Sequence, residues 1–426
     1  MRVATTVWLL TVLAPAVPAR EESPFMVQAL AIGHNLHGAS VVRDPDAGRL
    51  DLYYSGRTSS SEAHASIYRR TSTDAWNFTA PTTVWQHNSS TVPGENGTKH
   101  ALDPTVIRVF NHVFGTYFYV MYYTRLDPNT GSIDIWAVSS PDGSSWGAAG
   151  LVIPGGKEPC VVDIDGNDFW IYYRSTEEFF FRQRITGIFN IAGPPASLIC
   201  DGGLCFVADP AIAKLPDGTW KMVSTGPHPN NINRSALHEW LSLDGITWTA
   251  GTQPLVSTSP SLPPCSDLYH VTSPAIDLVG SGQTLLFMSM GPDVSCHGEE
   301  RYRIDEWWLD SSCVEGGLRF AHPFPGSAGF TNVSRILGGT PNGLVFLSLS
   351  FALQPVPIPG CNGTTLLLQP TPIVAPVPMS PGGNLVLTHA VSPSIAGLKV
   401  GMQLFDSVAT PGCSVGRVSN PLVVEY

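Results

Sequence analysis

Four short segments of this chain repeat one pattern at regular intervals. Each segment contains an acidic or hydroxyl residue, then a proline and then a short apolar run. The lead residues are Asp103, Glu158, Asp209 and Ser273, which are 55, 51 and 64 residues apart. A repeat near this period that is built only of strand-like pieces predicts the blades of a β-propeller. The first residue of each innermost strand would then lie near the central axis, where three carboxylates would meet.

Two longer stretches of the chain can be aligned with one another. Both end in the pattern Ser-x-Asp-Gly-x-x-Trp, at residues 140–146 and 242–248, and residues 72–76 hold a less regular copy. Asp-Gly favours a tight turn between two strands, and we expect the tryptophan to pack the following strand against its blade. We therefore interpret these segments as third strands that run into turns.

A first blade is present in degenerate form before the four clear copies. Residues 38–42 take the place of its innermost strand and residues 50–54 that of the next strand, so its axial position carries Gly38. No long segment shows the 3.6-residue apolar period of a helix. The sequence therefore predicts an all-β fold, with a five-bladed β-propeller over residues 30–320.

The residue composition of the sequence changes at about residue 321. Pro, Gly, Leu and Val then dominate, charged residues become rare, and the blade pattern stops. Apolar runs at residues 344–349, 365–368 and 384–388 are separated by Pro and Gly turns. These runs predict a small C-terminal β-sandwich over residues 321–426.

The N-terminus has the features of a secretory signal peptide. Arg2 precedes an apolar stretch from Val3 to Val12, and small residues come before Arg20. We expect residues 1–19 to be removed and the mature protein to be secreted, either extracellular or at the cell surface. No later apolar run is long enough for a membrane span, so none is expected in the mature chain.

The eight cysteines fit an oxidising compartment. The pairs that fall within one predicted unit are Cys200–Cys205, Cys265–Cys296 and Cys361–Cys413. Cys160 and Cys313 have no assigned partner. The sequence contains no Cys-x-x-Cys motif and no pair of histidines near the cysteines, which argues against a metal site.

Composition disfavours one class of partner. The net charge is −11, with 23 Lys and Arg against 34 Asp and Glu, so little positive charge is present to neutralise phosphates. We therefore expect no nucleic-acid binding. Hydrophobic residues make up 43% of the chain and charged residues 13%, which favours a packed core over disorder. The sequence leaves the oligomeric state open.

The propeller region resembles the five-bladed glycosidase clan, in particular glycoside hydrolase families 43 and 32. The residues that carry this resemblance are Asp103-Pro104, Glu158-Pro159-Cys160 and Asp209-Pro210, together with the two Ser-x-Asp-Gly-x-x-Trp strand ends. It covers about two thirds of the chain and is more specific for the fold than for the family. Residues 397–403 and 418–424 resemble a β-domain of secreted proteins from planctomycetes and similar bacteria, over about a quarter of the chain.

Cleavage of a glycosidic bond requires one protonated carboxyl group as general acid and one carboxylate as base or nucleophile. Several carboxyl groups in one funnel would have well-separated pKa values, which keeps one of them protonated. The resemblance implies Asp103, Glu158 and Asp209 as catalytic residues, with Glu158 as the acid and Asp103 as a neighbour that tunes its pKa or stabilises the transition state. In the alternative assignment of the clan's residues to this chain, Asp103 is the base and Asp209 is the residue that modulates the acid. Either assignment lacks one of the clan's three acids, because Gly38 and Ser273 occupy the remaining axial positions.

Three histidines, His37, His100 and His270, lie just before innermost strands, at the height of the funnel mouth. They are candidates for substrate binding because histidine can act as a base or a ligand near neutral pH. The alternative is that each one bonds a neighbouring loop. No cofactor is expected; the acids and histidines could accommodate calcium, but no loop has the ligand spacing for it.

Three functions remain open. The first is a secreted glycosidase that hydrolyses a polysaccharide, which rests on the three axial acids. The second is a non-catalytic, carbohydrate-binding propeller that has lost one acid, which Gly38 and Ser273 favour. The third is a structural or adhesive surface protein, which the C-terminal domain and the low charge favour. A sialidase is disfavoured because glycine directly follows aspartate in the strand-end pattern.

Overall fold

The computed structural model describes residues 23–32, 34–57, 62–73, 75, 77–147, 149–164, 168–205, 207–215, 217–228, 231–251, 254–256, 270–279, 283–291, 303–310, 319–320, 331–337, 339–350, 353–357, 365–368, 371–373, 376–381, 385–396, 398–406 and 422–425. These residues form strands almost throughout, and their one helix is a 3-10 turn at Pro393–Ile395. The prediction of an all-β fold is therefore confirmed. No helix in the described part of the chain has the length and hydropathy of a membrane span.

Five sheets built on antiparallel pairs make up the first part of the chain. Sheet 1 contains β2 (His34–Asp44), β3 (Arg49–Arg57), β4 (Ser66–Ser72) and β5 (Thr82–Trp85). Sheet 2 contains β6 (His100–Asn111), β7 (Thr116–Leu126), β8 (Ile133–Ser140) and β9 (Gly150–Pro154). Sheet 3 contains β10 (Gly156–Asp163), β11 (Phe169–Ser175), β12 (Phe180–Gly187) and β13 (Asn190–Ser197).

Sheets 4 and 5 continue the series with additional strands. Sheet 4 contains β16 (Ala208–Lys214), β17 (Trp220–His228), β18 (Asn231–Ser242) and β19 (Thr247–Ala250), and β14 (Ile199–Cys200) and β15 (Gly203–Leu204) extend its outer edge. Sheet 5 contains β20 (His270–Val279), β21 (Gln283–Gly291), β22 (Arg303–Asp310) and the N-terminal β1 (Ser23–Ile32), which pairs with β22. The ring of sheets therefore begins at Ser23, seven residues before the predicted boundary at 30, because the chain start supplies the outer strand of the last sheet.

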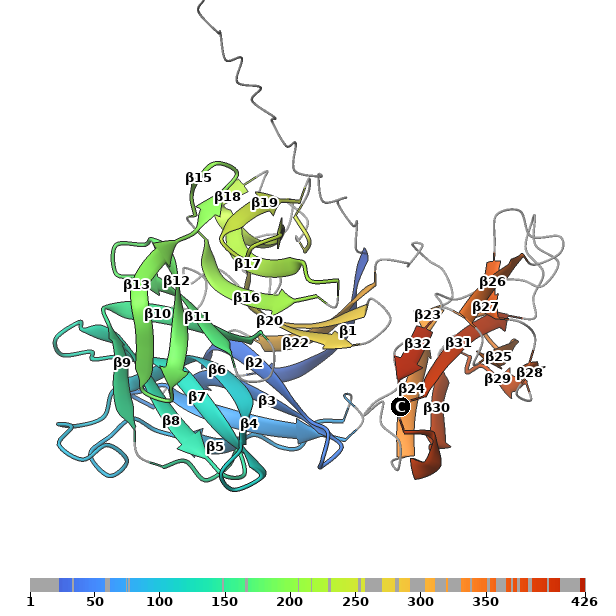
Figure 1. Cartoon of the computed structure of the whole chain (residues 1–426), viewed down its shortest axis with the longest axis horizontal. Coiled ribbons are helices and arrows are strands. Elements are labelled where there is room, and N and C mark those ends of the chain that lie inside the picture. The colour runs from blue at the N-terminus through green and yellow to red at the C-terminus, as the bar shows by residue number, and fades with distance from the viewer. Residues whose placement is uncertain are drawn as a thin grey trace, which may run out of the picture.

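The first strands of the five sheets surround a common centre. β2 contacts β6, β6 contacts β10, β10 contacts β16, β16 contacts β20, and β20 returns to β2. Figure 1 shows these sheets, coloured from blue to yellow, arranged around that centre. The lead residues of the sequence repeat all lie on these inner strands, as predicted.

Hydrogen bonds join neighbouring inner strands two residues beyond the lead position. Ser40 Oγ accepts from the Val106 N–H (2.9 Å), and Thr105 Oγ1 accepts from the Val161 N–H (3.2 Å). Cys160 Sγ takes the same place toward the Ile212 N–H (3.3 Å). Cys160 is a buried free thiol, and burial raises its pKa to about 12. Its role in the structure is thus that of a hydrogen-bond acceptor between sheets 3 and 4.

The two Ser-x-Asp-Gly turns are built alike. In sheet 4 the Ser242 hydroxyl accepts from the Gly245 N–H (2.9 Å), and Asp244 Oδ1 accepts from the N–H groups of Ile246 and Thr247 (2.8 and 2.7 Å). Gly245 has φ 68°, a conformation that glycine adopts without steric cost. Trp248 is fully buried in the core between sheets 3 and 4, so the tryptophan of the pattern packs as predicted.

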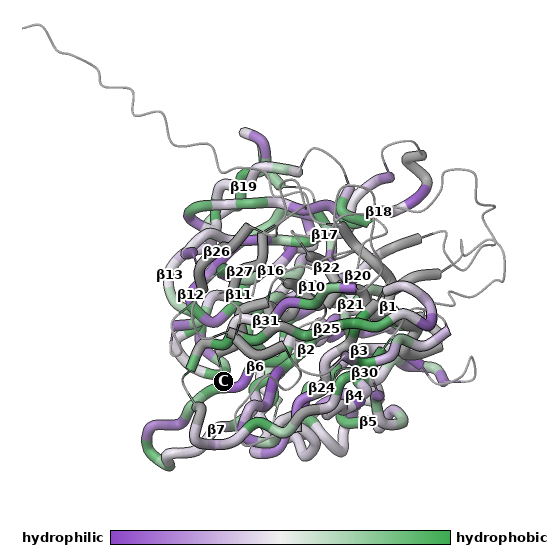
Figure 2. Tube along the Cα trace, turned by 90° about the vertical axis from the view of Figure 1, so that its right-hand side faces the viewer, coloured by the Kyte–Doolittle hydropathy of each residue, from purple (hydrophilic) through white to green (hydrophobic). Residues whose placement is uncertain are grey.

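The C-terminal strands have a hydrophobic core of their own, which includes Ile336, Val345, Met402 and Leu404. Its strands are β23 (Arg319–Phe320), β24 (Thr331–Leu337), β25 (Leu344–Ser350), β26 (Leu353–Pro357), β27 (Thr365–Leu368), β28 (Thr371–Ile373), β29 (Val377–Pro378), β30 (Leu385–Ala390), β31 (Lys399–Asp406) and β32 (Leu422–Glu425). They form the sheets β23-β24-β30, β28-β25-β31-β32 and β26-β27, and β29 pairs with β25. Figure 1 shows this group, in orange and red, apart from the ring. Hydrophobic and hydrophilic residues alternate at short intervals along many strands in Figure 2, as expected where one face of a strand is buried.

The disulfide between Cys200 and Cys205 is present, as predicted. The pairs Cys265–Cys296 and Cys361–Cys413, the thiol of Cys313 and the signal peptide at residues 1–19 lie outside the described residues. Asp74 and Trp76 of the irregular turn copy lie outside them as well.

Candidate active site

The five axial positions share one backbone geometry. In each sheet the pairing of the first two strands shifts by a bulge at the lead residue and the residue after it. The lead residues have φ between 45° and 57°, and they are Gly38, Asp103, Glu158, Asp209 and Ser273. Positive φ is uncommon for residues other than glycine, and bulges beside active sites turn a side chain in a new direction. The structure therefore brings the three predicted acids together at the axis.

All five lead residues line one cavity of about 30 Å³. That volume holds only a few water molecules. A sugar ring therefore could not lie between the axial side chains and would have to bind above them. Beneath this cavity, the next residues of the inner strands line a second axial cavity of about 90 Å³.

A ring of hydroxyl groups supports the lead residues from the second strands. Ser55 Oγ accepts from the Asp103 N–H (3.2 Å), and Thr124 Oγ1 accepts from the Glu158 N–H (2.9 Å). Thr225 Oγ1 accepts from the Ser273 N–H (3.0 Å). Each hydroxyl comes from the sheet that precedes the lead residue it supports. The hydroxyls therefore connect each sheet to the axial position of its neighbour.

Arg174 replaces the hydroxyl in sheet 3. Its Cα pairs with that of Lys157, the residue before Glu158, just as Thr124 pairs with the residue before Asp103. The Arg174 guanidinium binds Glu158 Oε1, and Glu158 Oε2 accepts from the Asp209 N–H (3.0 Å). Glu158 thus supplies the acceptor that a hydroxyl supplies elsewhere. Both of its oxygens are held by nitrogen donors of the protein.

The two aspartates are held differently. The Asp103 carboxyl group bonds the Thr124 side chain, and Asp209 Oδ2 accepts from the Thr225 hydroxyl (3.2 Å). Each of these carboxyl groups has one side-chain hydroxyl partner, whereas Glu158 has a guanidinium and a main-chain N–H. Asp103 and Asp209 are therefore better placed than Glu158 to offer an oxygen toward the axis.

The electrostatics of the site favour a retained proton. Burial and the charge of Asp209 raise the pKa of Asp103 to about 6, against a partial lowering by His37. Burial and the charge of Asp209 raise the pKa of Glu158 further, to about 8, with a smaller contribution from Asp103 and with Arg174 opposing the rise. Three carboxyl groups with one guanidinium in a buried site cannot all ionise without cost. We therefore expect the cluster to hold at least one proton at neutral pH and below.

The predicted histidines have different surroundings. His37 directly precedes Gly38 and lies close enough to Asp103 to lower its pKa, which places it at the site. His100 Nδ1 accepts from the Ala65 N–H (3.1 Å), and its ring contacts that of His64, 5.3 Å between centroids. His100 therefore bonds a neighbouring loop, which was the alternative to a role in substrate binding. His270 lies at the start of β20, and its side chain is outside the described residues.

The two axial positions without an acid, Gly38 and Ser273, differ in their surroundings. A Cβ added at Gly38 would lie 2.3 Å from Asp103 Cα, so an acid cannot be restored there without moving the backbone. Ser273 is 2% exposed and is held through its N–H by Thr225. The structure thus has three axial carboxyl groups, on sheets 2, 3 and 4.

Arg174 and the supporting hydroxyls are the site residues that sequence reasoning did not predict. The signal that could have revealed them is a second repeat, Tyr-Tyr-Ser, Tyr-Tyr-Thr and Tyr-Tyr-Arg, which ends at Ser55, Thr124 and Arg174. The register places all three opposite the residue before a lead position. Among the described residues, no group of three His, Cys, Asp or Glu side chains could hold a metal ion.

Comparisons with known proteins find similarity at the level of structure alone. No protein-family model matches the sequence, and no curated protein matches it. An α-L-arabinofuranosidase from Podospora anserina, solved with cellotriose, is 11% identical with a TM-score of 0.48, over 68% of this chain and 97% of its own. A family 62 glycoside hydrolase solved with xylotriose is 12% identical with a TM-score of 0.49, over 68% and 98%. A family 43 enzyme from Xanthomonas citri, solved with xylose, is 13% identical with a TM-score of 0.47, over 66% and 88%.

These solved structures are glycoside hydrolases of low sequence identity to this chain. Their similarity carries no argument about activity. The function proposed next rests on the axial site of this chain.

Proposed function

We propose that sheets 1–5 form a five-bladed β-propeller, followed by a C-terminal β-sandwich, in a secreted protein that hydrolyses glycosidic bonds of a polysaccharide. The observation that carries this proposal is the convergence of Asp103, Glu158 and Asp209 around one axial cavity. A carboxyl group that retains its proton, beside another carboxylate, is what acid-assisted cleavage of a glycosidic bond requires.

Within this proposal, Asp103 is the proton donor and Asp209 the second carboxylate. The pKa of Asp103, about 6, allows it to carry a proton in mildly acidic solution, although the pKa of Glu158, about 8, is higher still. Glu158 acts as a positioning residue, because Arg174 and the Asp209 N–H already occupy its oxygens. The resemblance to the glycosidase clan favours the other assignment, in which Glu158 is the acid.

The first test is the release of reducing sugar from arabinan, xylan, fructan, mannan and algal galactans by the purified protein. We expect release that falls at least 100-fold in Asp103→Asn and Asp209→Asn, the scale of a lost general acid or base. The control is Glu177→Gln, which changes an exposed acid in the β11–β12 turn and should keep activity. If only Glu158→Gln abolishes release, the clan's assignment holds.

A second candidate function is carbohydrate binding without catalysis. The close packing of Gly38 on Asp103 favours it, because that contact removes one axial acid position. Under this alternative no polymer is cleaved, yet one of them binds with an affinity that the axial substitutions weaken. Glycan binding measured on the same variants separates the two functions.

A further inference from the structure

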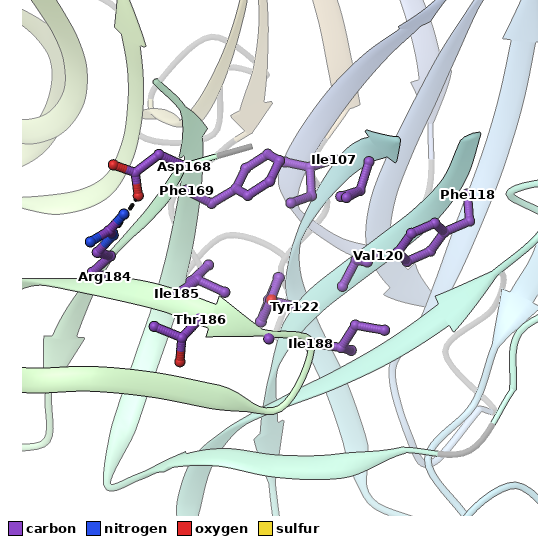
Figure 3. Close-up of a pocket in the computed structure, with 12 residues that line it drawn as sticks. Ile107, Phe118, Val120, Tyr122, Asp168, Phe169, Arg184, Ile185, Thr186 and Ile188 are labelled. Atoms are coloured by element: carbon purple, nitrogen blue, oxygen red, sulfur yellow. Dashed lines mark hydrogen bonds and ion pairs between the residues drawn. The ribbon is translucent and has the colours of Figure 1, made fainter. Parts of the chain in front are cut away.

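A cavity of about 470 Å³ lies between sheets 2 and 3, away from the axial site. Its walls come from β6, β7, β11 and β12 and from the turn after β12, and most are aliphatic or aromatic side chains, such as Val109, Phe118 and Ile188. Figure 3 shows the Asp168–Arg184 ion pair (2.7 Å) at one edge of the lining residues. Ile107, the lining residue of β6 nearest Asp103, is four residues further along the strand, about 13 Å at the usual rise.

The equivalent places at two other sheet boundaries are filled. The Tyr53 hydroxyl of β3 donates to the Gly143 carbonyl of sheet 2 (2.9 Å). The Tyr172 hydroxyl of β11 donates to the Gly245 carbonyl of sheet 4 (3.2 Å). In both cases, a tyrosine of one sheet reaches the Asp-Gly turn of the next. Tyr122 of β7 occupies the same position in sheet 2, since it pairs with Thr105 as Tyr53 pairs with Ser40.

Sheet 3 lacks the turn that would receive the Tyr122 hydroxyl. The strand register aligns Ile185 of β12 with Ser140 of β8 and with Ser242 of β18. Their partners on the second strands each pair in turn with the inner-strand residue five positions after the lead residue. Gly187 and Ile188 then stand where the other sheets have Asp and Gly. Without the aspartate, the tight Asp-Gly turn does not form, and the cavity lies in its place.

Tyr122 therefore has a polar group in an apolar cavity. Its side chain is 1% exposed, and its hydroxyl has no hydrogen-bond partner among the described residues. Burial raises its pKa, so the phenol keeps its proton. The hydroxyl is not one of the fully buried polar atoms without a partner, so it is open to the cavity, where a bound molecule would supply a hydrogen-bond partner. Figure 3 shows Tyr122 between Ile185 and Ile188 in the lining.

We propose that this cavity binds a small, uncharged, mainly apolar molecule with a hydroxyl or carbonyl group, which hydrogen-bonds to the Tyr122 hydroxyl. Cavities of about 300 to 1,000 Å³ with apolar walls and a few polar groups are typical ligand sites. The axial cavity is far smaller than this. The proposal does not depend on the proposed hydrolytic function, since it uses different residues, further along β6 and β7 from the axial site.

The test measures binding of benzyl alcohol and of toluene to the full chain by isothermal titration calorimetry. Benzyl alcohol carries the hydroxyl, and toluene has nearly the same shape without it. We expect both to bind, and Tyr122→Phe to weaken benzyl alcohol about five- to tenfold while toluene affinity stays unchanged. The matched control is Tyr172→Phe, which removes the equivalent hydroxyl at the next sheet boundary and should leave both affinities unchanged.

Two further variants locate the site. Ile188→Trp fills the cavity from the turn and Val109→Phe fills it from β6, and either should abolish binding of both probes. The proposal is overturned if neither probe binds the unchanged protein. It is also overturned if a folded cavity-filling variant still binds, or if Tyr122→Phe weakens both probes equally.

Thermal stability without ligand provides an independent readout. Tyr172→Phe should lower Tm because it removes the bond to the Gly245 carbonyl. Tyr122→Phe should leave Tm unchanged or raise it, since its hydroxyl has no partner to lose. An equal loss of Tm in both variants would show that Tyr122 is already bonded within the protein and would overturn the proposal.

Discussion

At the residue scale, Asp103 combines a strained backbone conformation with the unfavourable proximity of a second carboxylate. Its φ is 48°, and burial and the charge of Asp209 raise its pKa from 3.8 to about 6. Both features cost folding free energy, and unfavourable geometry of this kind clusters at functional sites. The same bulge holds a serine in sheet 5, which shows that the fold does not require an acid there.

The pKa of Asp103 predicts how stability depends on pH. The folded state holds the proton more tightly than the unfolded state, so the contribution of Asp103 is fully present below pH 4. It is lost as pH rises through about 6. Asp103→Asn removes this loss, so we expect it to raise the free energy of unfolding at pH 7.5 by up to about 3 kcal/mol.

Urea unfolding of both proteins at pH 4 and pH 7.5 measures this effect. The gain from Asp103→Asn should be small at pH 4. An equal gain at both pH values would mean that the carboxyl group does not hold a proton in the folded state. Ser55→Ala is a useful control, because it removes the acceptor of the Asp103 N–H without changing charge.

At the element scale, the Ser-x-Asp-Gly turns end the third strands of sheets 2 and 4 and fill the gap to the preceding sheet. In sheet 4 the Asp244 carboxylate accepts two main-chain N–H groups, and the Arg182 guanidinium donates to the Asp244 carbonyl (2.8 Å). Burial raises the pKa of Asp244, but the N–H donors of Thr247 and Ile246 outweigh it, so the pKa is lowered. The carboxylate is therefore part of the turn.

Asp244→Ala should destabilise the protein by about 1 to 2 kcal/mol, because two main-chain N–H groups lose their acceptor. Asp244→Asn keeps an acceptor oxygen and should cost less than half as much. Chemical denaturation at pH 7 measures both changes. Equal destabilisation by the two substitutions would contradict the view that the acceptor oxygen, and not the charge, maintains the turn.

At the scale of the whole molecule, the ring is closed by pairing distant parts of the chain. β1 at the N-terminus pairs with β22, which begins 280 residues after β1 starts. The pairing covers an edge of β22 that would otherwise be unpaired, and unpaired edges invite aggregation. The C-terminal strands, by contrast, have their own hydrophobic core.

Two truncations test this organisation. A chain that begins at residue 34 lacks β1, and we expect it to lose several degrees in Tm and to aggregate. A chain that ends at residue 318 lacks the C-terminal strands, and its ring should unfold within a few degrees of the full chain. Differential scanning calorimetry measures both. An unchanged Tm without β1 would show that ring closure contributes little.

Much of the fold could be predicted from the sequence, because it depends on local patterns that repeat. The lead segments, the strands after them and the Asp-Gly turns were all located from residue types and spacing. β1 was not predicted, because its partner lies at the far end of the ring. Trp248 shows the same division: the motif predicted that it packs, but the strand register decided that it packs between sheets 3 and 4.

By itself, the sequence determined the class of fold and the three acids at the axis. The reason is that the proline-containing inner strand recurs along the chain as the sheets recur around the centre. The tertiary structure alone decided what surrounds these acids. Arg174 meets Glu158, Gly38 packs on Asp103, and Tyr122 is left without a partner only because separate strands come into register. Contacts of this kind depend on three-dimensional proximity, which residue spacing along a single chain does not encode.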